Sequence, residues 1–400
     1  MKIPEILLIQ TPHSPGALAS VLNVIAEAGL LLEDLTSVWH GRDDTLWEIT
    51  VDTGNAARAE LVDRLNALPR ARFITWADHT CDYRHGGNVE MRSRVAIVTD
   101  GSAVLRRGNF LARASLAAIE GKAALFAELV GISGIPMLIE SGAVDHFVDV
   151  VCAIAPSFGA ILLEDIGAPR CFEIEQKLRA RLPMPVLHDN QHGTAVVVLA
   201  ALLNASRQIG APLNSLTVGV IGLGAAGLGI ARLLHSHGVK RLLGTDLRAQ
   251  AIGRLAQLHG HRESVKHILE RADAVICATG AKGLIAPERV RPGQIIFALS
   301  DPDPEIEPAA ALAAGAAVAA DGKRINNVWC FPGLFDAALR AHARAFTDAM
   351  LVAAANALAT AAPAGQLLPD PLDASVHAQV SQAVQAVARE ELRDGKVRMR

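Results

Sequence analysis

The sequence predicts an α/β protein of several domains, preceded by a small α+β unit. A self-contained pattern of strands and helices covers residues 3–79. From residue 94 onward, short buried-strand patterns alternate with helical ones, which is typical of parallel sheets. A glycine-rich turn between a strand and a helix lies at residues 222–227. At 400 residues, the chain has room for two or three domains, each with its own core.

Composition and charge exclude several classes of protein. Hydrophobic residues make up 51% of the chain and charged residues 20%, so we expect a globular protein rather than a disordered one. The net charge is −3 without a basic block, so nucleic acid is not an expected partner. No apolar stretch is long enough to span a bilayer, and the start of the chain is patterned as a strand rather than a signal peptide. The five cysteines lack CxxC spacing, which favours reduced thiols and a cytoplasmic location.

The first 79 residues are patterned as βαββαβ. We expect one helix that ends at Gly29, a second helix over residues 56–68, and strands at residues 6–9, 31–40, 45–51 and 72–76. This order predicts a small ferredoxin-like sandwich. Together with the turn at residues 14–18 (SPGAL), it resembles the ACT family of regulatory domains. The resemblance implies that an amino acid or another metabolite binds at residues 14–17 as an effector. A dimerisation module without a ligand is the open alternative.

Acidic side chains follow two strands of the predicted sheet. Residues 150–163, interrupted by Pro156, and residues 184–187 are patterned as buried parallel strands, with a helix at residues 169–182 between them. Their carboxyl ends meet at one edge of a sheet. The polar residues at these two ends are Glu164, Asp165, His188, Asp189 and Asn190. Like charges held close repel unless a cation neutralises them, and such oxygen ligands suit Mg²⁺ or Mn²⁺. One acidic pair would more simply cap a helix, but two at adjacent strand ends favour a metal site.

Lys122 lies in the segment EGKAALF, within a helix predicted over residues 119–130. Burial among small and apolar residues disfavours the charged form of a lysine, which allows it to act as a base near neutral pH. A surface lysine whose stem covers apolar neighbours is the simpler alternative, and the residues alone favour it.

A strand at residues 216–221, the glycine-rich turn and a helix at residues 228–237 match the dinucleotide-binding pattern GxGxxG. The turn consists of Gly222, Leu223, Gly224, Ala225, Ala226 and Gly227. Its glycines permit close approach to a pyrophosphate, and the helix N-terminus favours negative charge. The next strand ends at Asp246, where an acid binds the ribose hydroxyls and repels a 2′-phosphate. We therefore expect a Rossmann-type domain that binds NAD, with NADP less favoured, although Arg248 nearby weakens that preference.

Two further strands are expected at residues 274–278 and 294–299, and a helical tail at residues 337–361. Asn326 and Asn327 lie in the loop before this tail. An amide at the edge of such a sheet contacts nicotinamide or a substrate carboxylate, but a simple turn is an equally open interpretation. The polar stretch over residues 80–93 predicts a linker. We expect a substrate and metal domain at residues 94–203 and a nucleotide-binding domain at residues 204–400.

From about Val95 to the tail, the chain resembles bacterial NAD(P)-dependent malic enzymes. The motifs that carry the resemblance are TDGSAVL, EGKAALF, LLEDI, HDNQHGT, GLGAAG, DPEI and INNVWCFPG, in this order. The resemblance implies oxidative decarboxylation of L-malate to pyruvate and CO₂, with NAD as hydride acceptor and Mg²⁺ or Mn²⁺ as cofactor. It also implies a homodimer or larger assembly.

The resemblance assigns roles to individual residues. Lys122 matches the general base, and Asn327 matches an amide that contacts the substrate and nicotinamide. Glu164 and Asp165 match two metal ligands. Asn190 stands at the third ligand position, which is usually an aspartate in the family, unless Asp189 turns in to replace it. Asp189 is therefore also a catalytic candidate.

Three departures from the family bear on activity. The segment that carries the family's catalytic tyrosine is absent, and the only tyrosine, Tyr83, lies in the linker. Asp301 replaces an asparagine near the substrate, where it would repel a dianion unless a cation intervenes. Arg106 and Arg107 replace small or apolar residues and would clamp a substrate carboxylate, although exposed arginines are the simpler alternative.

Two further functions therefore stay open beside a divergent NAD-dependent malic enzyme. One is a metal-dependent oxidoreductase for another 2-hydroxy acid. The other is a catalytically impaired homologue that binds NAD or a metabolite and acts as a regulatory protein.

Overall fold

The computed structural model describes residues 5–40, 43–52, 58–77, 94–103, 115–140 and 142–393. The chain divides into two compact units, residues 1–91 and residues 92–400. The predicted linker with Tyr83 lies outside the described residues, as do Arg106 and Arg107. None of the helices in the described ranges has the length and apolar character to cross a membrane. The described cysteines Cys152, Cys171, Cys277 and Cys330 are free thiols.

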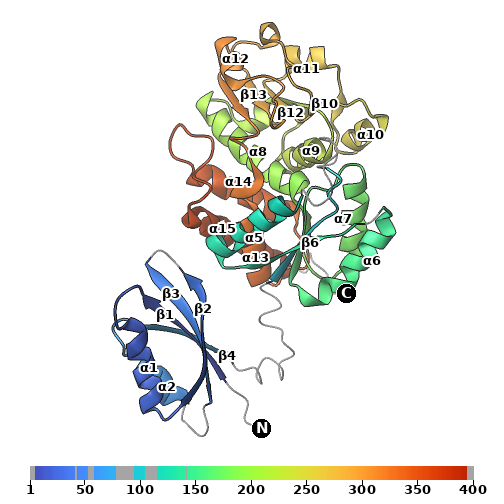
Figure 1. Ribbon diagram of the computed structural model, residues 1–400. Helices are drawn as coiled ribbons and strands as arrows, with labels where there is room; N and C mark the ends of the chain where they lie inside the picture. Colours follow the sequence, from blue (N-terminus) through green and yellow to red (C-terminus); the bar gives the residue numbers. More distant parts are fainter. Residues whose placement is uncertain are drawn as a thin grey trace. The chain divides into compact units, whose positions relative to one another are not determined.

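The first unit is a four-stranded antiparallel sheet with two helices on one face (Figure 1). Its elements are β1 (Glu5–Pro12), α1 (Ala17–Glu27), β2 (Leu31–His40), β3 (Asp44–Asp52), α2 (Arg58–Asn66) and β4 (Arg72–Ala77). The strand order is β2-β3-β1-β4, which confirms the βαββαβ order and the ferredoxin-like arrangement. Alternate residues such as Leu7 and Ile9 are fully buried, because successive side chains of a strand point to opposite faces.

The second unit begins with a parallel sheet in the order β6-β5-β7-β8. Its elements are β5 (Arg94–Thr99), α5 (Leu116–Val130), β6 (Ser133–Leu138), α6 (Val144–Ile154), the 3₁₀ turn Ala155–Ser157, β7 (Ala160–Leu163), α7 (Arg170–Arg181) and β8 (Val186–His188). The predicted strand at residues 150–163 is wrong over its first half, since residues 150–154 end α6. That helix buries Phe147, Val148 and Val151 at helical spacing. A short apolar run does not distinguish a strand from a buried helix.

A long helix, α8 (Asp189–Gln208), leads to a second, six-stranded parallel sheet in the order β11-β10-β9-β12-β13-β14. This is the doubly wound order of a Rossmann-type domain, as predicted. Its elements are the 3₁₀ turn Leu213–Ser215, β9 (Thr217–Ile221), α9 (Ala225–His237), β10 (Arg241–Thr245), α10 (Ala249–Gln257), β11 (His261–Arg262), α11 (Val265–Arg271), β12 (Ala274–Cys277), the 3₁₀ turn Pro287–Arg289, β13 (Ile295–Ala298), α12 (Pro308–Ala313) and β14 (Val318–Asp321).

The predicted helical tail is two helices rather than one, and a third follows. After the 3₁₀ turn Asn327–Trp329 come α13 (Phe331–Arg340), α14 (Asp348–Ala361) and α15 (Ala374–Arg393). Helices α13 and α15 contact α5, and α14 contacts α8. Phe126 of α5 meets the rings of Phe331 and Phe335 edge-on, with centroids 4.9 and 5.5 Å apart. The C-terminal helices therefore fix the helix that carries Lys122.

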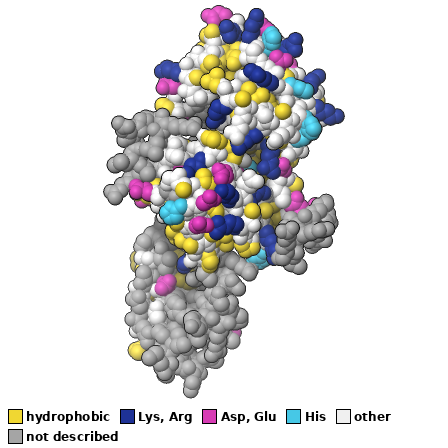
Figure 2. Space-filling model, turned by 90° about the vertical axis from the view of Figure 1, so that its right-hand side faces the viewer, with side chains coloured by type: hydrophobic (Ala, Val, Ile, Leu, Met, Phe, Trp, Pro, Cys, Tyr) yellow, Lys and Arg dark blue, Asp and Glu magenta, His cyan; other side chains and the backbone are white. Residues whose placement is uncertain are grey.

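The face shown in Figure 2 has acidic and basic side chains of the second unit interspersed with apolar ones. Among the described residues on this face, we see no large patch of a single charge. This agrees with the small net charge of the whole chain, −3.

Candidate functional site

The ammonium group of Lys122 lies at the centre of the site. This residue is 7% exposed, so the alternative of a surface lysine is wrong. Its Nζ atom contacts the carboxylate of Asp189, lies 3.3 Å from Oε2 of Glu164 and donates a hydrogen bond of 3.3 Å to Oδ1 of Asn327. The ring of Phe331 packs against it, with Nζ 4.3 Å from the ring centroid. Residues far apart in the sequence therefore meet at one nitrogen.

The charges at this centre are unbalanced. Burial alone lowers the pKa of Lys122, but the negative charges of Asp189 and Glu164 outweigh it, and the pKa lies above its usual value. The expected lowering of this pKa is therefore wrong for the metal-free protein. Burial raises the pKa of Glu164 to about 8, and the charges of Asp189 and Asp165 add to that effect. Burial also raises the pKa of Asp189. Two carboxylates share one ammonium group and Asp165 adds a third negative charge nearby, so a cation would relieve their repulsion.

Asp189 is oriented toward Lys122. One carboxylate oxygen contacts Lys122, and the other, Oδ1, packs against Gly193 in the same helix. A Cβ atom on Gly193 would lie 1.9 Å from this oxygen, so a larger residue there would displace the carboxylate. The glycine of the segment HDNQHGT thus makes room for the carboxylate that holds Lys122.

Asn190 and Asp165 hydrogen-bond to each other at two points. The backbone N–H of Asp165 donates to Oδ1 of Asn190 at 2.9 Å, and Nδ2 of Asn190 donates to Oδ1 of Asp165 at 3.1 Å. Asp165 adopts a left-handed backbone conformation, with φ +49°. Asn190 therefore orients Asp165, and its amide oxygen keeps one lone pair for a further partner.

These residues fit a divalent cation in their chemistry. Among the described residues, Lys122 is the only partner of the Glu164 carboxylate, which is buried. In the same ranges, no three Asp, Glu, His or Cys side chains surround one point. Two carboxylates, from Glu164 and Asp165, and the amide oxygen of Asn190 are the oxygen atoms that could hold such an ion. Carboxylate and amide oxygens suit Mg²⁺ or Mn²⁺, and three ligands leave positions for a chelating substrate.

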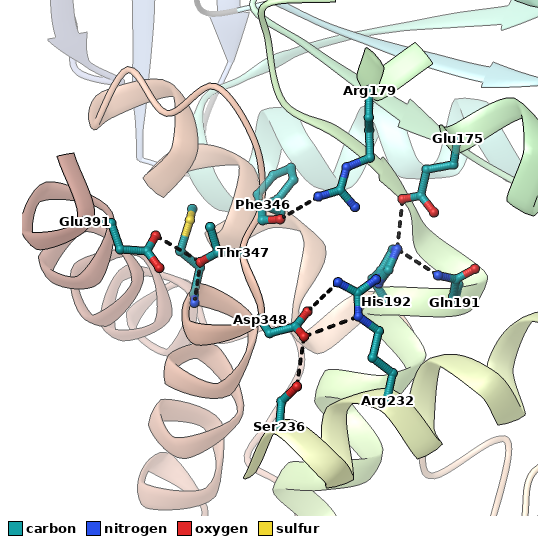
Figure 3. Close-up of polar contacts among 11 residues, drawn as sticks. Glu175, Arg179, Gln191, His192, Arg232, Ser236, Phe346, Thr347, Asp348 and Glu391 are labelled. Carbon is teal, nitrogen blue, oxygen red and sulfur yellow. Dashed lines mark hydrogen bonds and ion pairs between the residues drawn. The ribbon is translucent and has the colours of Figure 1, made fainter. Parts of the chain in front are cut away.

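A buried glutamate on α7 fixes the start of α8 (Figure 3). Oε1 of Glu175 hydrogen-bonds with Nε2 of His192 at 2.8 Å and accepts the backbone N–H of His188 at 3.3 Å. Burial alone raises the pKa of Glu175, but the neighbouring histidines and an arginine lower it to about 2. The residue thus stays ionised and anchors both ends of the segment that contains Asp189 and Asn190.

The loop before α14 connects α7 to α9 (Figure 3). Arg179 of α7 donates to the carbonyl oxygen of Phe346 at 3.2 Å. Two residues later, the carboxylate of Asp348 pairs with Arg232 of α9 at 3.0 Å and accepts a hydrogen bond of 2.8 Å from Ser236. Residues 346–348 therefore connect α7, which follows the acidic residues Glu164 and Asp165, to α9, which follows the glycine-rich turn.

A cavity of about 530 Å³ lies at the carboxyl ends of β9, β10 and β12. Its lining includes Gly222, Gly224, Asp246, Arg248, Thr279 and Leu284. Gly222 has φ +89°, and a Cβ atom there would lie 2.5 Å from the carbonyl oxygen of Ala278. A Cβ atom on Gly227 would lie 1.9 Å from the carbonyl oxygen of Gly222. Gly222 is therefore required for the turn to fit against the end of β12, and Gly227 is required for α9 to start close to the turn, while Ala225 and Ala226 form the first turn of α9.

Asp246 connects the glycine-rich turn to the end of β10. Oδ2 accepts the backbone N–H of Leu223 at 2.7 Å, and Oδ1 accepts the backbone N–H and Nε of Arg248 at 2.8 and 3.1 Å. Burial raises the pKa of Asp246, but these donors outweigh it and hold the pKa below its usual range. Arg248 is half-exposed at the cavity, where its guanidinium group is held by the same carboxylate.

The structure separates the two interpretations of the remaining predicted residues, a site contact and a simple turn. Asn327 faces Lys122, whereas Asn326 forms a turn in which its side chain accepts the backbone N–H of Val328 at 3.1 Å. Asp301 is exposed in the loop after β13 and is not among the described contacts of Lys122. Arg106 lies outside the described residues, so its predicted contact with substrate stays a prediction.

Comparison with known proteins decides the family. The family described as "Malic enzyme, NAD binding domain" matches residues 191–255 and 247–390, and "Malic enzyme, N-terminal domain" matches residues 140–179. NAD-dependent malic enzyme 1 of Bacillus subtilis (strain 168) is 42% identical to this chain, over 96% of this chain and 97% of its own length. The chain belongs to the malic enzyme family.

Solved structures of malic enzymes share the fold. The malic enzyme of Pyrococcus horikoshii Ot3 has a TM-score of 0.72 and 35% identity, and the alignment covers 80% of this chain and 82% of the other. An NAD-dependent malic enzyme of Thermotoga maritima has a TM-score of 0.70 and 30% identity, with 83% and 99% covered. The family predicted from the motifs is thus confirmed.

Sequence reasoning missed several residues that shape the site of this malic enzyme. Phe331 lies in the segment NVWCFPG, where nothing signals its contact with Lys122. The sequence pattern predicts that Glu175 is an ordinary acid on a helix surface, because its histidine partners lie in another segment. Arg170, which donates to Asp100 at 2.8 Å, was likewise missed, although the acid lies in the quoted segment TDGSAVL. In each case the partner is distant in the sequence.

Proposed function

We propose that this malic enzyme oxidatively decarboxylates L-malate to pyruvate and CO₂, with NAD as hydride acceptor. One observation carries the proposal. The amino group of Lys122 touches Glu164 of the acidic pair and also Asn327, which follows the last strand of the nucleotide-binding sheet. This contact would bring a base and a metal ligand to the cofactor domain. In this proposal, residues 94–203 bind the substrate and metal, and residues 204–400 bind NAD.

Glu164, Asp165 and the amide oxygen of Asn190 are the residues that would hold Mg²⁺ or Mn²⁺. Such an ion would chelate the carboxylate and hydroxyl of malate and stabilise the enolate that remains after CO₂ leaves. A cation at these residues would neutralise Glu164, one of the two charges that raise the pKa of Lys122, so burial would lower that pKa further against the remaining charge of Asp189.

Lys122 then takes the proton of the malate 2-hydroxyl group while the hydride leaves C2 for the nicotinamide ring. Asp189 stabilises the ammonium group that results, because its carboxylate is already in contact with Nζ. Asn327, which accepts a hydrogen bond from the same amine, would orient the substrate and nicotinamide. We propose Arg106, which lies outside the described residues, as a partner of a substrate carboxylate, and Asp301 in the loop after β13 as a further substrate-site residue.

Loss of CO₂ leaves enolpyruvate, whose C3 atom must gain a proton. The family segment that contains a tyrosine for this step is absent from this sequence, so we propose that hydride transfer proceeds and tautomerisation is slow. Purified protein with L-malate, NAD and Mn²⁺ should therefore form NADH, measured at 340 nm, ahead of pyruvate, measured by a coupled reductase. If NAD binds but no 2-hydroxy acid reduces it, the protein is the regulatory homologue instead.

Cofactor choice gives a testable prediction. Asp246→Ala should raise the KM for NAD about tenfold, because the ribose acceptor is lost and Leu223 N–H is left unpaired. The same variant should lower the KM for NADP, since Arg248 is released to meet a 2′-phosphate. The double variant with Arg248→Ala should lose that gain. Steady-state kinetics with both cofactors measure the effect, and an unchanged NAD-to-NADP preference would contradict the assignment.

For the first unit, we propose an ACT-type regulatory domain that binds an amino acid or a related metabolite in a homodimer or larger assembly. The turn before α1 supports this. Gly16 has φ +82°, and Oγ of Ser14 is buried without a hydrogen-bond partner among the described residues. Calorimetric titration of the full-length protein with individual amino acids should give a binding signal for at least one, and Ser14→Ala should weaken it. The absence of heat with all of them would favour a dimerisation module.

A further inference from the structure

Glu305 is a fully buried residue whose carboxylate joins the ends of two strands of the nucleotide-binding sheet. It lies in the loop between β13 and α12 and has no exposed surface. Oε1 accepts the backbone N–H and the hydroxyl of Thr279, both at 2.7 Å, and the hydroxyl of Ser300 at 2.6 Å. Oε2 accepts the backbone N–H of Ser300 at 3.3 Å. Four donors from the ends of β12 and β13 thus converge on one side chain.

No cation pairs with this carboxylate among the described residues, and all its hydrogen-bond donors are uncharged. A buried charge without a counter-ion is costly for stability, and hydrogen bonds offset that cost only when the donors are held in place. A neutral or apolar residue would join two loops more simply. The carboxylate is therefore better explained by the geometry that it imposes on Thr279 and Ser300.

One of the two residues that Glu305 holds belongs to the wall of the cofactor cavity, and the other contacts the backbone beside it. Thr279 lines that cavity, and its methyl group lies only 2.9 Å from where a Cβ atom on Gly222 would stand. Ser300 uses its hydroxyl oxygen a second time, to accept the backbone N–H of Gly280 at 2.8 Å. The carboxylate, the two strand ends and the glycine-rich turn therefore form one continuous set of contacts.

The strand order indicates which half of a dinucleotide these residues face. Asp246 follows β10, on one side of β9, whereas β12 and β13 lie on the other side. In a doubly wound sheet, a dinucleotide crosses at the turn after the first strand, with its pyrophosphate at the glycines. The adenosine end then lies toward Asp246 and the nicotinamide end toward Thr279 and Ser300. We infer that Glu305 is the positioning residue for the nicotinamide half of the NAD site, an inference that rests on the proposed function.

Binding measurements on the full-length protein test this role without requiring turnover. Glu305→Gln keeps the size of the side chain and one acceptor oxygen, but its NH₂ group cannot accept the fourth donor, the backbone N–H of Ser300 if the oxygen stays on the Oε1 side. It should raise the Kd of NAD about tenfold, or about 1.4 kcal/mol, and leave the Kd of ADP-ribose, which lacks nicotinamide, unchanged. The matched control is Glu307→Gln, an exposed glutamate in the same loop, which should change neither value.

Ser300→Ala removes one donor and serves as the milder variant if Glu305→Gln does not fold. It should raise the Kd of NAD about threefold and again spare ADP-ribose. Equal weakening of NAD and ADP-ribose, or no change in NAD affinity, would overturn the inference. A wild-type protein that binds NAD but does not oxidise malate would refute the proposed function and leave this inference intact.

Discussion

Replacement of Lys122 by alanine is expected to lower kcat for malate oxidation by about 10²- to 10⁴-fold, the usual contribution of a general base, while NAD still binds. The reason is that Lys122 is the amine on which Glu164, Asp189 and Asn327 converge. Steady-state kinetics with saturating Mn²⁺ give kcat, and fluorescence titration gives NAD affinity. The matched control is Lys177→Ala, whose exposed side chain pairs with Asp145 and Glu173, and this variant should retain full turnover.

The same replacement leaves the carboxylate of Asp189 buried without its partner, which destabilises a protein by about 3–5 kcal/mol. Lys122→Arg separates this effect from catalysis, because it restores the positive charge but not a group that loses its proton. We expect Lys122→Arg to recover most of the thermal stability and none of the turnover. Turnover within a few-fold of wild type in either variant would mean that another group is the base.

Glu164→Gln is expected to weaken Mn²⁺ binding about 100-fold or more, since the proposed site loses one of its two negative ligands. Wild-type affinity should itself depend on pH. Because burial raises the pKa of Glu164 to about 8, a proton competes with the metal below that pH. Mn²⁺ affinity should therefore rise as the pH increases toward 8 and level off above it. In Glu164→Gln, that pH dependence should be reduced. Titration of Mn²⁺ between pH 6 and 9 measures both effects.

Asn190→Asp is the informative partner of that variant. It places a carboxylate at the third ligand position, so Mn²⁺ should bind about tenfold more tightly than in wild type. Without metal, the new charge faces Asp165 and the hydrogen bond from Nδ2 of Asn190 is lost, so the melting temperature should fall. If Glu164→Gln and Asn190→Asp both leave Mn²⁺ affinity unchanged, the metal binds elsewhere.

The sequence predicted those parts of the site that rest on local patterns. Strand–turn–helix spacing identified the glycine-rich turn, and polar residues after apolar runs identified Glu164 and Asp165. These features need only neighbours along the chain, and the sheet order then placed them as expected.

The parts that failed depend on distant contacts. The pKa of Lys122 rises because of contact with Asp189, which is 67 residues away in the sequence. Asn327, the other hydrogen-bond partner, is 205 residues away. Strands β6 and β14 were not predicted, because glycine, proline and alanine replace the β-branched residues that mark a strand. The error at residues 150–154 has a similar origin, since packing decides whether a short apolar run becomes a helix.

Helix α8 has a mechanical consequence. It starts at the proposed metal site with Asp189 and Asn190, and its residues from Ala195 to Leu202 are fully or almost fully buried. Gly229 lets α9 approach so closely that a Cβ atom there would lie 2.2 Å from the carbonyl oxygen of Gln191. At 20 residues and without an internal proline, α8 is a stiff rod about 30 Å long. Any displacement of one sheet relative to the other must therefore pivot at the ends of this rod, where one end carries the acidic residues.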